Sequence, residues 1–193
     1  MKTKKCRLAI FASGGGTNAE AIIEYLAEHP NIEVSTIYTN NADAYVLQRA
    51  KNHNIPSVVF TKKEFLESAF KNQLVTENYD LIVLAGFMWL IPPAIVSAFN
   101  TKIINIHPAL LPNYGGKGMY GHFVHEAVIN NKEIESGITI HYVNEQYDEG
   151  SIILQAKCSV LATDSPDSLA EKIHILEHRH YPEVIEKICN KNL

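Results

Sequence analysis

The first half of the chain alternates between short apolar segments and segments whose apolar residues recur at helical spacing. The apolar segments, each expected to form a buried strand, cover residues 6–13, 33–39, 57–61, 81–85 and 102–106. The helical segments lie between them at 18–29, 44–53 and 63–77, with a short helix after Pro92-Pro93. Strands that alternate with helices in this way are joined by right-handed crossovers and pair in parallel. We therefore expect an α/β fold built on a doubly wound, mostly parallel sheet.

The second half of the chain follows a different pattern. Two strands are expected at 138–143 and 152–160, and the loop of about eight residues between them is too short for a crossover helix. These strands should form an antiparallel addition to the sheet. A helix at 122–131 precedes them and a long helix at 166–191 follows. Because no repeat or linker interrupts the pattern, we predict a single domain over residues 1–193.

Composition and charge argue against several classes of partner. The net charge is −4 and the Lys and Arg residues are spread along the chain, which provides no basic surface for a nucleic acid. No apolar run approaches the length of a membrane span, and the one near the N-terminus is too short for a signal peptide. Cys6, Cys158 and Cys189 are widely separated, which counts against a disulfide framework or a thiolate zinc site and fits a reducing compartment. We expect a cytoplasmic protein with no nucleic-acid or membrane partner.

The glycine-rich segment 13–18, Ser-Gly-Gly-Gly-Thr-Asn, joins the first predicted strand to the first predicted helix. Glycines allow a ligand to approach the backbone closely, and the free N–H groups at a helix start attract anions. Three glycines exceed what a turn needs. We therefore expect this loop to bind a phosphate or another anion.

Two other interpretations of this loop stay open. The first is a tight turn in which Thr17 or Asn18 caps the helix. The second is a dinucleotide-binding loop, because the glycines and Ala19 satisfy the loose GxGxxA pattern. Against the second, Asn40-Asn41 stand where an acidic ribose ligand is expected. The loop is not a Walker motif, because no Lys-Ser/Thr pair closes it.

Asn105 and His107 end the fifth predicted strand, where ligands bind in doubly wound sheets. Alternation along the strand puts both on one side and Ile106 on the other. An amide beside an imidazole suits acyl transfer, because one stabilises a developing oxyanion and the other moves a proton. Asp148 lies in the loop between the two late strands, where an Asp close to Gly150 fits turn chemistry. If the fold brings Asp148 to His107, the carboxylate should raise the pKa of the imidazole.

Nine histidines raise the question of a metal site. His174 and His178 are four residues apart on the last predicted helix, and His180 lies close by. The sequence has no HExxH motif and no set of carboxylates and histidines with the spacing of metal ligands. A solvated helix face explains these histidines better, so no metal is expected.

Taken together, these motifs resemble the phosphoribosylglycinamide formyltransferase (glycinamide ribonucleotide transformylase) family. The segments that carry the resemblance are Ser-Gly-Gly-Gly-Thr-Asn at 13–18, Ala-Gly-Phe-Met at 85–88, Asn-Ile-His-Pro-Ala-Leu-Leu-Pro at 105–112, Gly-Ile-Thr-Ile-His-Tyr-Val at 137–143, Asp-Glu-Gly at 148–150, Ile-Ile-Leu-Gln at 152–155 and Glu-His at 177–178. Their combination is specific and covers nearly the whole chain. It implies a transferase that moves the formyl group of 10-formyltetrahydrofolate, a co-substrate, to the amine of 5-phosphoribosylglycinamide in de novo purine biosynthesis.

The resemblance also implies roles for individual residues. The catalytic positions are Asn105, His107 and Asp148. The residues expected to bind the ribonucleotide are Gly16, Thr17, Asn18, His174 and Glu177, the first three at its phosphate and Glu177 at its ribose hydroxyls. The residues expected to bind the folate are Lys63, Met88, Trp89, Leu90, Ile91, Asn105, Asn144 and Asp148.

The sequence departs from the family pattern at several positions. Trp89 stands where many members have Arg, and His174 replaces the Gln or Lys common three residues before Glu177. Lys63 also stands where many members have Arg, which keeps the charge and loses the planar fork. The segment 114–121 is longer than in many relatives, and we expect it to be a flexible lid over the site.

Other functions based on the same motifs stay open. A formyltetrahydrofolate hydrolase or a tRNA formyltransferase has the same Asn-His-Asp set, but usually an additional regulatory or RNA-binding domain for which this chain has no room. A nucleotide-binding module explains the glycine loop alone and leaves Asn105, His107 and Asp148 without a role. In the transfer reaction, the amine attacks the formyl carbon, Asn105 and protonated His107 stabilise the oxyanion, and Asp148 orients His107.

Overall fold

A seven-stranded sheet forms the centre of the structure, a computed structural model that describes residues 5–191. The elements in chain order are β1 (Cys6–Phe11), α1 (Thr17–Leu26), β2 (Ile32–Thr39), α2 (Val46–Asn52), β3 (Ser57–Val59), α3 (Lys62–Leu66), α4 (Ser68–Thr76), β4 (Leu81–Leu84), α5 (Pro93–Ala98), β5 (Ile103–His107), α6 (His122–Asn130), β6 (Glu135–Tyr142), β7 (Ile152–Ser159) and α7 (Pro166–Lys191). The strands lie in the order β3-β2-β1-β4-β5-β6-β7. Strands β1 to β5 pair in parallel, whereas β5 with β6 and β6 with β7 pair antiparallel. The predicted doubly wound sheet with an antiparallel addition is confirmed.

The direction of winding reverses between β1 and β4. From β1 the chain runs outward through β2 to β3 and then returns to β4, which pairs with the other side of β1. The loops that follow the carboxyl ends of β1 and β4 therefore run in opposite directions and leave a crevice between them. Two hydrogen bonds of 3.0 Å tie these loops together: Ser13 N–H donates to the Gly86 carbonyl, and Met88 N–H donates to the Ser13 hydroxyl.

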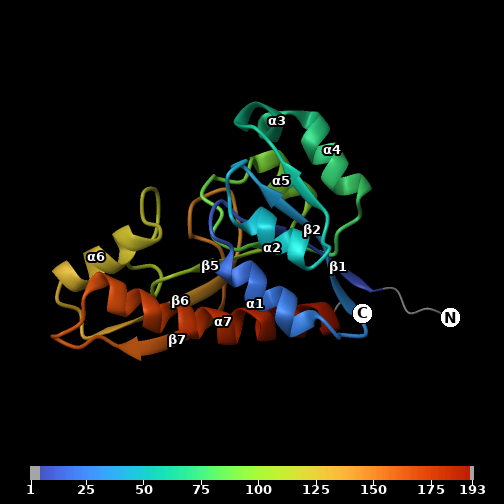
Figure 1. Ribbon diagram of the computed structural model, residues 1–193. Helices are drawn as coiled ribbons and strands as arrows, with labels where there is room; N and C mark the ends of the chain where they lie inside the picture. The colour runs from blue at the N-terminus through green and yellow to red at the C-terminus, as the bar shows by residue number, and fades with distance from the viewer. Residues whose placement is uncertain (1–4, 192–193) are drawn as a thin grey trace.

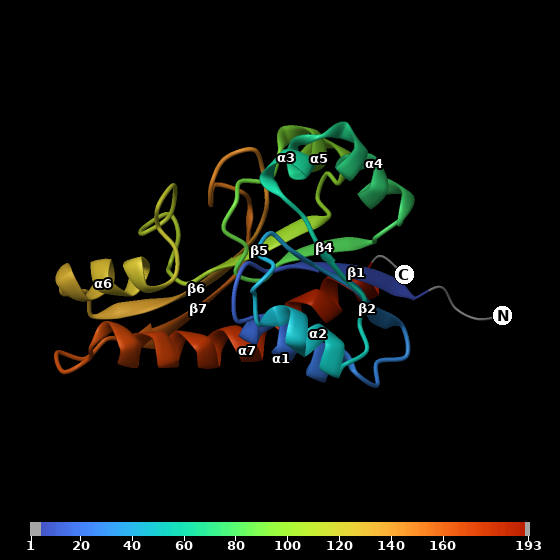
Figure 2. The ribbon, with the colours of Figure 1, turned by 45° about the horizontal axis from the view of Figure 1, so that its top comes forward.

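Helices cover both faces of the sheet, as Figure 1 and Figure 2 show. Helices α1, α2 and α7 pack on one face, and α3, α4 and α5 pack on the other. Helix α6 lies beside α7 near β6 and β7. The alternation in β1 explains why two cores form, because Leu8 and Ile10 join the first core and Ala9 and Phe11 join the second.

The second core is rich in aromatic rings and explains why the single helix predicted at 63–77 is wrong. The structure has two helices there, α3 and α4, separated by Glu67 in an extended conformation with φ −80° and ψ 146°. Phe65 and Phe70 would point in different directions from one continuous helix. The break lets both side chains enter the core, where their ring centroids lie 5.5 Å apart.

The antiparallel addition is longer than the sequence pattern indicates. Strand β6 begins at Glu135 instead of residue 138, because residues 135–137 pair with the end of β7. Helix α7 runs without interruption through Pro182, which is buried.

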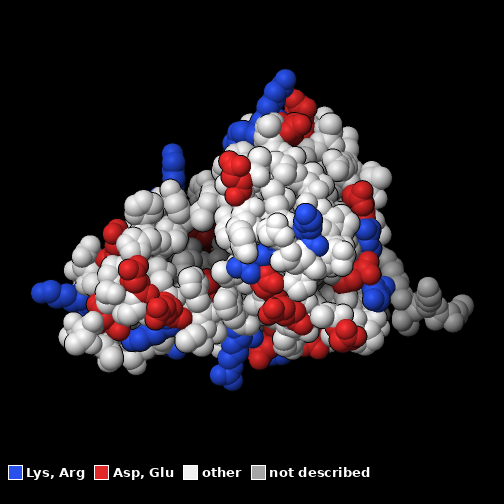
Figure 3. Space-filling model, in the orientation of Figure 1, with Lys and Arg blue, Asp and Glu red and all other residues white. Residues whose placement is uncertain are grey.

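Two observations concern the surface. On the face shown in Figure 3, Lys and Arg side chains lie among Asp and Glu side chains and form no continuous basic surface. The absence of a nucleic-acid partner stays a prediction.

None of the helices in the described part of the chain is long and apolar enough to cross a membrane.

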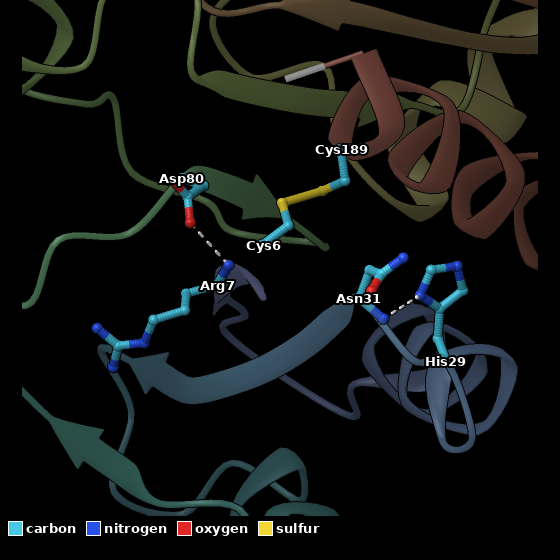
Figure 4. Close-up of a disulfide and its surroundings, with 6 residues drawn as sticks. All are labelled: Cys6, Arg7, His29, Asn31, Asp80 and Cys189. Carbon is cyan, nitrogen blue, oxygen red and sulfur yellow. Dashed lines mark hydrogen bonds between the residues drawn. A yellow bond between two sulfur atoms is a disulfide. The ribbon is translucent and has the colours of Figure 1, made fainter. Parts of the chain in front are cut away.

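The expectation against disulfide bonding is wrong for one pair of cysteines. Sγ of Cys6 is bonded to Sγ of Cys189, with the two Cα atoms 5.9 Å apart. Figure 4 shows this bond between β1 and α7. Both side chains are buried in the first core, and Cys158 is free. A separation of 183 residues leaves no local pattern in the sequence that could reveal such a pair.

We predict that the unreduced protein, once denatured, exposes a single reactive thiol, that of Cys158, and that dithiothreitol makes Cys6 and Cys189 reactive as well. Mass spectrometry after iodoacetamide labelling measures this. Reduction should also lower the free energy of unfolding by up to about 5 kcal/mol, because the bond restricts the unfolded chain over a long loop. Urea titrations with and without reductant measure that difference.

The matched control is Cys158→Ser, which should lose the labelled thiol and keep the same dependence of stability on reductant. Labelling of Cys6 or Cys189 in the unreduced, denatured protein would contradict the bond.

Candidate active site

A cavity of about 670 Å³ lies at the carboxyl ends of β1, β4 and β5. Its walls come from several segments: the glycine loop after β1, residues 84–91 at and after the end of β4, the end of β5, the loop 116–121, His125 of α6, parts of the segment 141–148 and the side of α7 that carries Ile173, His174 and Glu177. Segments that are far apart in the sequence therefore meet at the crevice of the doubly wound sheet.

The glycine loop presents unpaired backbone N–H groups at the start of α1. Gly16 is the N-cap, with φ +71° and no side chain that caps the helix. No described residue accepts a hydrogen bond from the N–H of Thr17 or Asn18. Gly16 occupies the N-cap, so the part of the turn interpretation in which Thr17 or Asn18 caps the helix is wrong. Free N–H groups at the positive end of a helix dipole suit an anion.

Helix α2 holds this loop in place from the other side. Val46 N–H donates to the Gly14 carbonyl at 3.2 Å, and Nε of Arg49 donates to the Gly15 carbonyl at 2.7 Å. A Cβ atom at Gly16 would lie 2.5 Å from Cγ2 of Val46, whereas a Cβ at Gly14 or Gly15 would have no atom within 4 Å. Gly16 is thus required for packing, and the other two glycines leave open space for a ligand.

Asn18 and Glu177 meet on the cavity wall between α1 and α7. Nδ2 of Asn18 donates to Oε2 of Glu177 at 2.9 Å, and Glu177 is 6% exposed. Burial raises the pKa of Glu177 to about 7, although the hydrogen bond from Asn18 acts in the opposite direction. Oδ1 of Asn18 is buried without a partner among residues 5–191. The pair therefore offers hydrogen-bonding groups for ligand hydroxyls next to the glycine loop.

Asp148 joins Asn105 and His107 at the end of β5. Its Oδ2 lies 3.5 Å from Nδ1 of His107, and its Oδ1 lies 3.4 Å from Nδ2 of Asn105. The backbone N–H of Gly116 donates to Oδ2 at 3.0 Å. Ile106 lies in the first core on the opposite side of the strand. The predicted shared side of Asn105 and His107, and the predicted approach of Asp148, are therefore confirmed as geometry.

Burial controls the protonation of His107. Its Nε2 lies 2.7 Å from the carbonyl oxygen of Tyr114 and donates to it, because a carbonyl oxygen can only accept. The other ring nitrogen, Nδ1, faces Asp148. Burial lowers the pKa of His107, and it outweighs the Asp148 carboxylate and the Tyr114 carbonyl, which raise it. The expected effect of Asp148 is present, but the net pKa is lowered. For Asp148, burial raises the pKa, yet His141, His107 and the Gly116 N–H together lower it below its usual value.

His141 is a site residue that the sequence analysis did not single out. It lies in β6 opposite Asn105, in the antiparallel register. Nδ1 of His141 donates to its neighbouring carbonyl, that of Tyr142, at 2.8 Å, which leaves Nε2 to accept from Nδ2 of Asn105 at 3.2 Å. The amide hydrogens of Asn105 are thus directed at His141 and, over a longer distance, at Asp148. A polar residue within the apolar segment 137–143 was the available signal, but only strand pairing shows what it faces.

The predicted folate residues are brought to the cavity in part. Those that line it, besides Asn105 and Asp148, are Met88, Trp89, Leu90 and Ile91. Lys63 and Asn144 do not line it. Instead, Nζ of Lys62 lies 4.5 Å from the ring centroid of Trp89, a cation–π contact. The roles of all these residues toward a folate stay predictions.

The predicted lid, residues 114–121, is anchored at its start. Tyr114 and Gly116 bond to His107 and Asp148, as described above. Farther along, the ring of Tyr120 packs edge-on against Phe123, with centroids 5.4 Å apart. Movement of this loop stays a prediction.

Two groups of side chains bear on the metal question. His174 lines the cavity, and its ring stacks on that of His178 with centroids 6.1 Å apart. Within the described ranges, a single group could hold a cation, formed by Glu20, Glu24 and His53 outside the cavity. Glu20 already pairs there with the Arg49 guanidinium, which supplies positive charge, and with His53. The expectation of no metal stays a prediction.

Comparisons with known proteins agree on the family to which the chain is similar. The sequence profile of the formyl transferase family matches residues 6–185. A chloroplastic phosphoribosylglycinamide formyltransferase of Arabidopsis thaliana is 40% identical over 197 residues, which cover 98% of this chain and 68% of that protein. A phosphoribosylglycinamide formyltransferase of Bacillus subtilis is 36% identical and covers 96% of both chains. The solved structure of the phosphoribosylglycinamide formyltransferase of Anaplasma phagocytophilum has a TM-score of 0.89 at 34% identity, with 97% of this chain and 88% of that chain covered.

We predict that Gly16→Ala lowers the free energy of unfolding by roughly 2–4 kcal/mol. The reasons are the positive φ and the close approach of Val46. Gly15→Ala is the matched control and should change stability by less than about 1 kcal/mol, because its Cβ enters open space. Urea denaturation followed by circular dichroism measures both variants. Equal stabilities for the two would contradict the packing of Val46 against Gly16.

Proposed function

The chain belongs to the formyl transferase family, and on this premise we propose that it transfers the formyl group of 10-formyltetrahydrofolate to the amine of 5-phosphoribosylglycinamide in purine biosynthesis. One observation carries the proposal. A single cavity contains both an anion loop at the start of α1 and the joined side chains of Asn105, His107 and Asp148. These two parts suit the two ends of the ribonucleotide, its phosphate and its reacting amine.

The ribonucleotide is proposed to extend from α1 toward β5. Its phosphate accepts hydrogen bonds from the free N–H groups of Thr17 and Asn18. Its ribose hydroxyls bond to the carboxyl group of Glu177, which burial and Asn18 fix in position. This orientation directs the amine toward the end of β5. The folate is assigned to the remaining wall, formed by residues 84–91 and parts of 143–148.

The reaction forms one C–N bond and breaks another. The neutral amine attacks the formyl carbon and gives a tetrahedral intermediate with negative charge on oxygen. Nδ2 of Asn105 donates to that oxygen in place of its 3.4 Å bond to Asp148, which is the weaker of its two bonds. The protonated form of His107 stabilises the same charge. As the bond to the folate nitrogen breaks, the imidazolium supplies a proton to that nitrogen, directly or through water. The proton that the attacking amine loses then restores the imidazolium.

Asp148 provides the counter-charge for this step. Its pKa is lowered below the ordinary value, so it stays ionised at neutral pH. His107, in contrast, is held largely neutral by burial before substrate binds. The carboxylate therefore favours the imidazolium at the stage where the proton is needed, without a permanent charge pair.

The decisive experiment combines purified protein with 10-formyltetrahydrofolate, with and without the ribonucleotide, and measures release of tetrahydrofolate. We predict release that depends on the ribonucleotide, and a loss of about 10²–10⁴-fold in kcat for His107→Ala. His122→Ala is the matched control, because His122 is exposed and does not line the cavity. Release without the ribonucleotide would indicate a hydrolase instead, and no release in either case would refute the proposal.

We predict that Asp148→Asn lowers kcat and moves the alkaline limb of the pH–rate profile to lower pH. Without the carboxylate, only the hydrogen bond to the Tyr114 carbonyl opposes the effect of burial on His107. Its pKa therefore falls further, and less of the reactive imidazolium is present at a given pH. The profile of kcat and an NMR titration of His107 measure the shift. The control is Asp43→Asn on the surface, and an unchanged alkaline limb in Asp148→Asn would count against the pair.

A further inference from the structure

His125 is a buried polar residue of the cavity that the mechanism above does not use. It lies in α6, is 4% exposed and lines the cavity. Its Nδ1 is buried and has no hydrogen-bond partner among the described residues. Unpartnered buried polar atoms are rare in native proteins, because each loses its hydration without compensation. A bound ligand that supplies the missing partner would remove this cost.

The imidazole of His125 is neutral over the physiological range. Burial is the main cause, and any positive charge on the neighbouring His174, His122 and His107 acts in the same direction, so its pKa is lowered to about 4. A neutral imidazole carries one N–H donor and one lone-pair acceptor. It therefore suits an uncharged ligand group that also offers one donor and one acceptor.

The neighbours of His125 indicate which part of the substrate it meets. It lines the same cavity as His107, at the end of β5, and as His174, one turn of α7 before Glu177. Figure 1 and Figure 2 show α6, the helix that contains His125, beside α7, the helix that contains His174 and Glu177. In the orientation proposed above, the amide group between the ribose and the amine spans this interval.

We propose that His125 hydrogen-bonds the amide group that links the ribose of the ribonucleotide to its reacting amine, and thereby positions the amine. This inference rests on the proposed function. The amide has one N–H and one carbonyl group, which match the acceptor and the donor of the imidazole. Fixing the amide fixes the direction of the amine one carbon away, and such orientation accelerates attack. It also selects against ribose phosphates without the amide, because these leave the imidazole unpaired.

The test compares two ligands on the full-length protein by calorimetry, without folate. 5-Phosphoribosylglycinamide contains the amide, whereas ribose 5-phosphate lacks it. His125→Leu should weaken binding of the ribonucleotide about 10-fold or more and leave that of ribose 5-phosphate within about 2-fold. His122→Leu is the matched control on the same helix, with a side chain 53% exposed, and should bind both ligands like the wild type.

A second pair of variants distinguishes positioning from packing. His125→Asn and His125→Gln place an amide near Nδ1 and near Nε2, respectively, and one of them should restore ribonucleotide binding and kcat relative to His125→Leu. The melting temperature of the ligand-free His125→Leu protein should be unchanged or higher, because an unpartnered polar group has been removed. If His125→Leu does not fold, His125→Asn and His125→Gln alone test the proposal. These two variants should then differ from each other in their binding of the ribonucleotide and not in their binding of ribose 5-phosphate.

The outcomes separate the two proposals. If the wild type fails to bind the ribonucleotide, the proposed function is refuted. If the wild type binds it and His125→Leu binds both ligands unchanged, or loses both equally, only the role of His125 is refuted. Failure of both Asn and Gln to recover any ribonucleotide-specific binding would refute it as well.

Discussion

Asp148 carries its charge at a position almost out of contact with water, where its side chain is 11% exposed. A carboxylate removed from water is costly unless hydrogen bonds and positive charge compensate. The compensation comes from hydrogen bonds donated by the Asn105 amide and the Gly116 N–H, and from His107 and His141, whose protonated forms place positive charge beside the carboxylate. Displacement of any one of these segments would leave the buried charge partly unpaired. The geometry of the site and the packing of the loop therefore depend on this one carboxylate.

The same exclusion of water sets the protonation of the other cavity residues. Burial raises the pKa of Glu177 to about 7 and lowers that of His125 to about 4, and it lowers the pKa of His107 against the effect of Asp148. The cavity thus contains one firmly ionised carboxylate among polar groups that are held partly or fully neutral. Such groups suit ligand hydroxyls and amides, whereas the free N–H groups at the start of α1 suit an anion.

The two halves of the sheet supply different parts of this chemistry. The parallel half provides the glycine loop, because parallel strands are followed by helices whose free N–H groups point back to the sheet edge. The antiparallel half provides His141 within β6 and Asp148 just after it, and its register sets His141 opposite Asn105. The cavity lies where the two halves join, so neither half forms the site alone. The disulfide bond between Cys6 and Cys189 joins β1 to α7 on the sheet face opposite the aromatic core.

The sequence by itself determined the doubly wound sheet, the antiparallel addition, the glycine loop at the start of the first helix and the shared side of Asn105 and His107. These features depend on periodicity and turn chemistry, which contiguous residues carry. Only the tertiary structure decided that Cys6 bonds Cys189, that His141 completes the group around Asn105, and that burial prevails over the carboxylate in setting the pKa of His107. Each of these results depends on which distant segments meet and on how completely they exclude water, and no local pattern in the chain encodes either quantity.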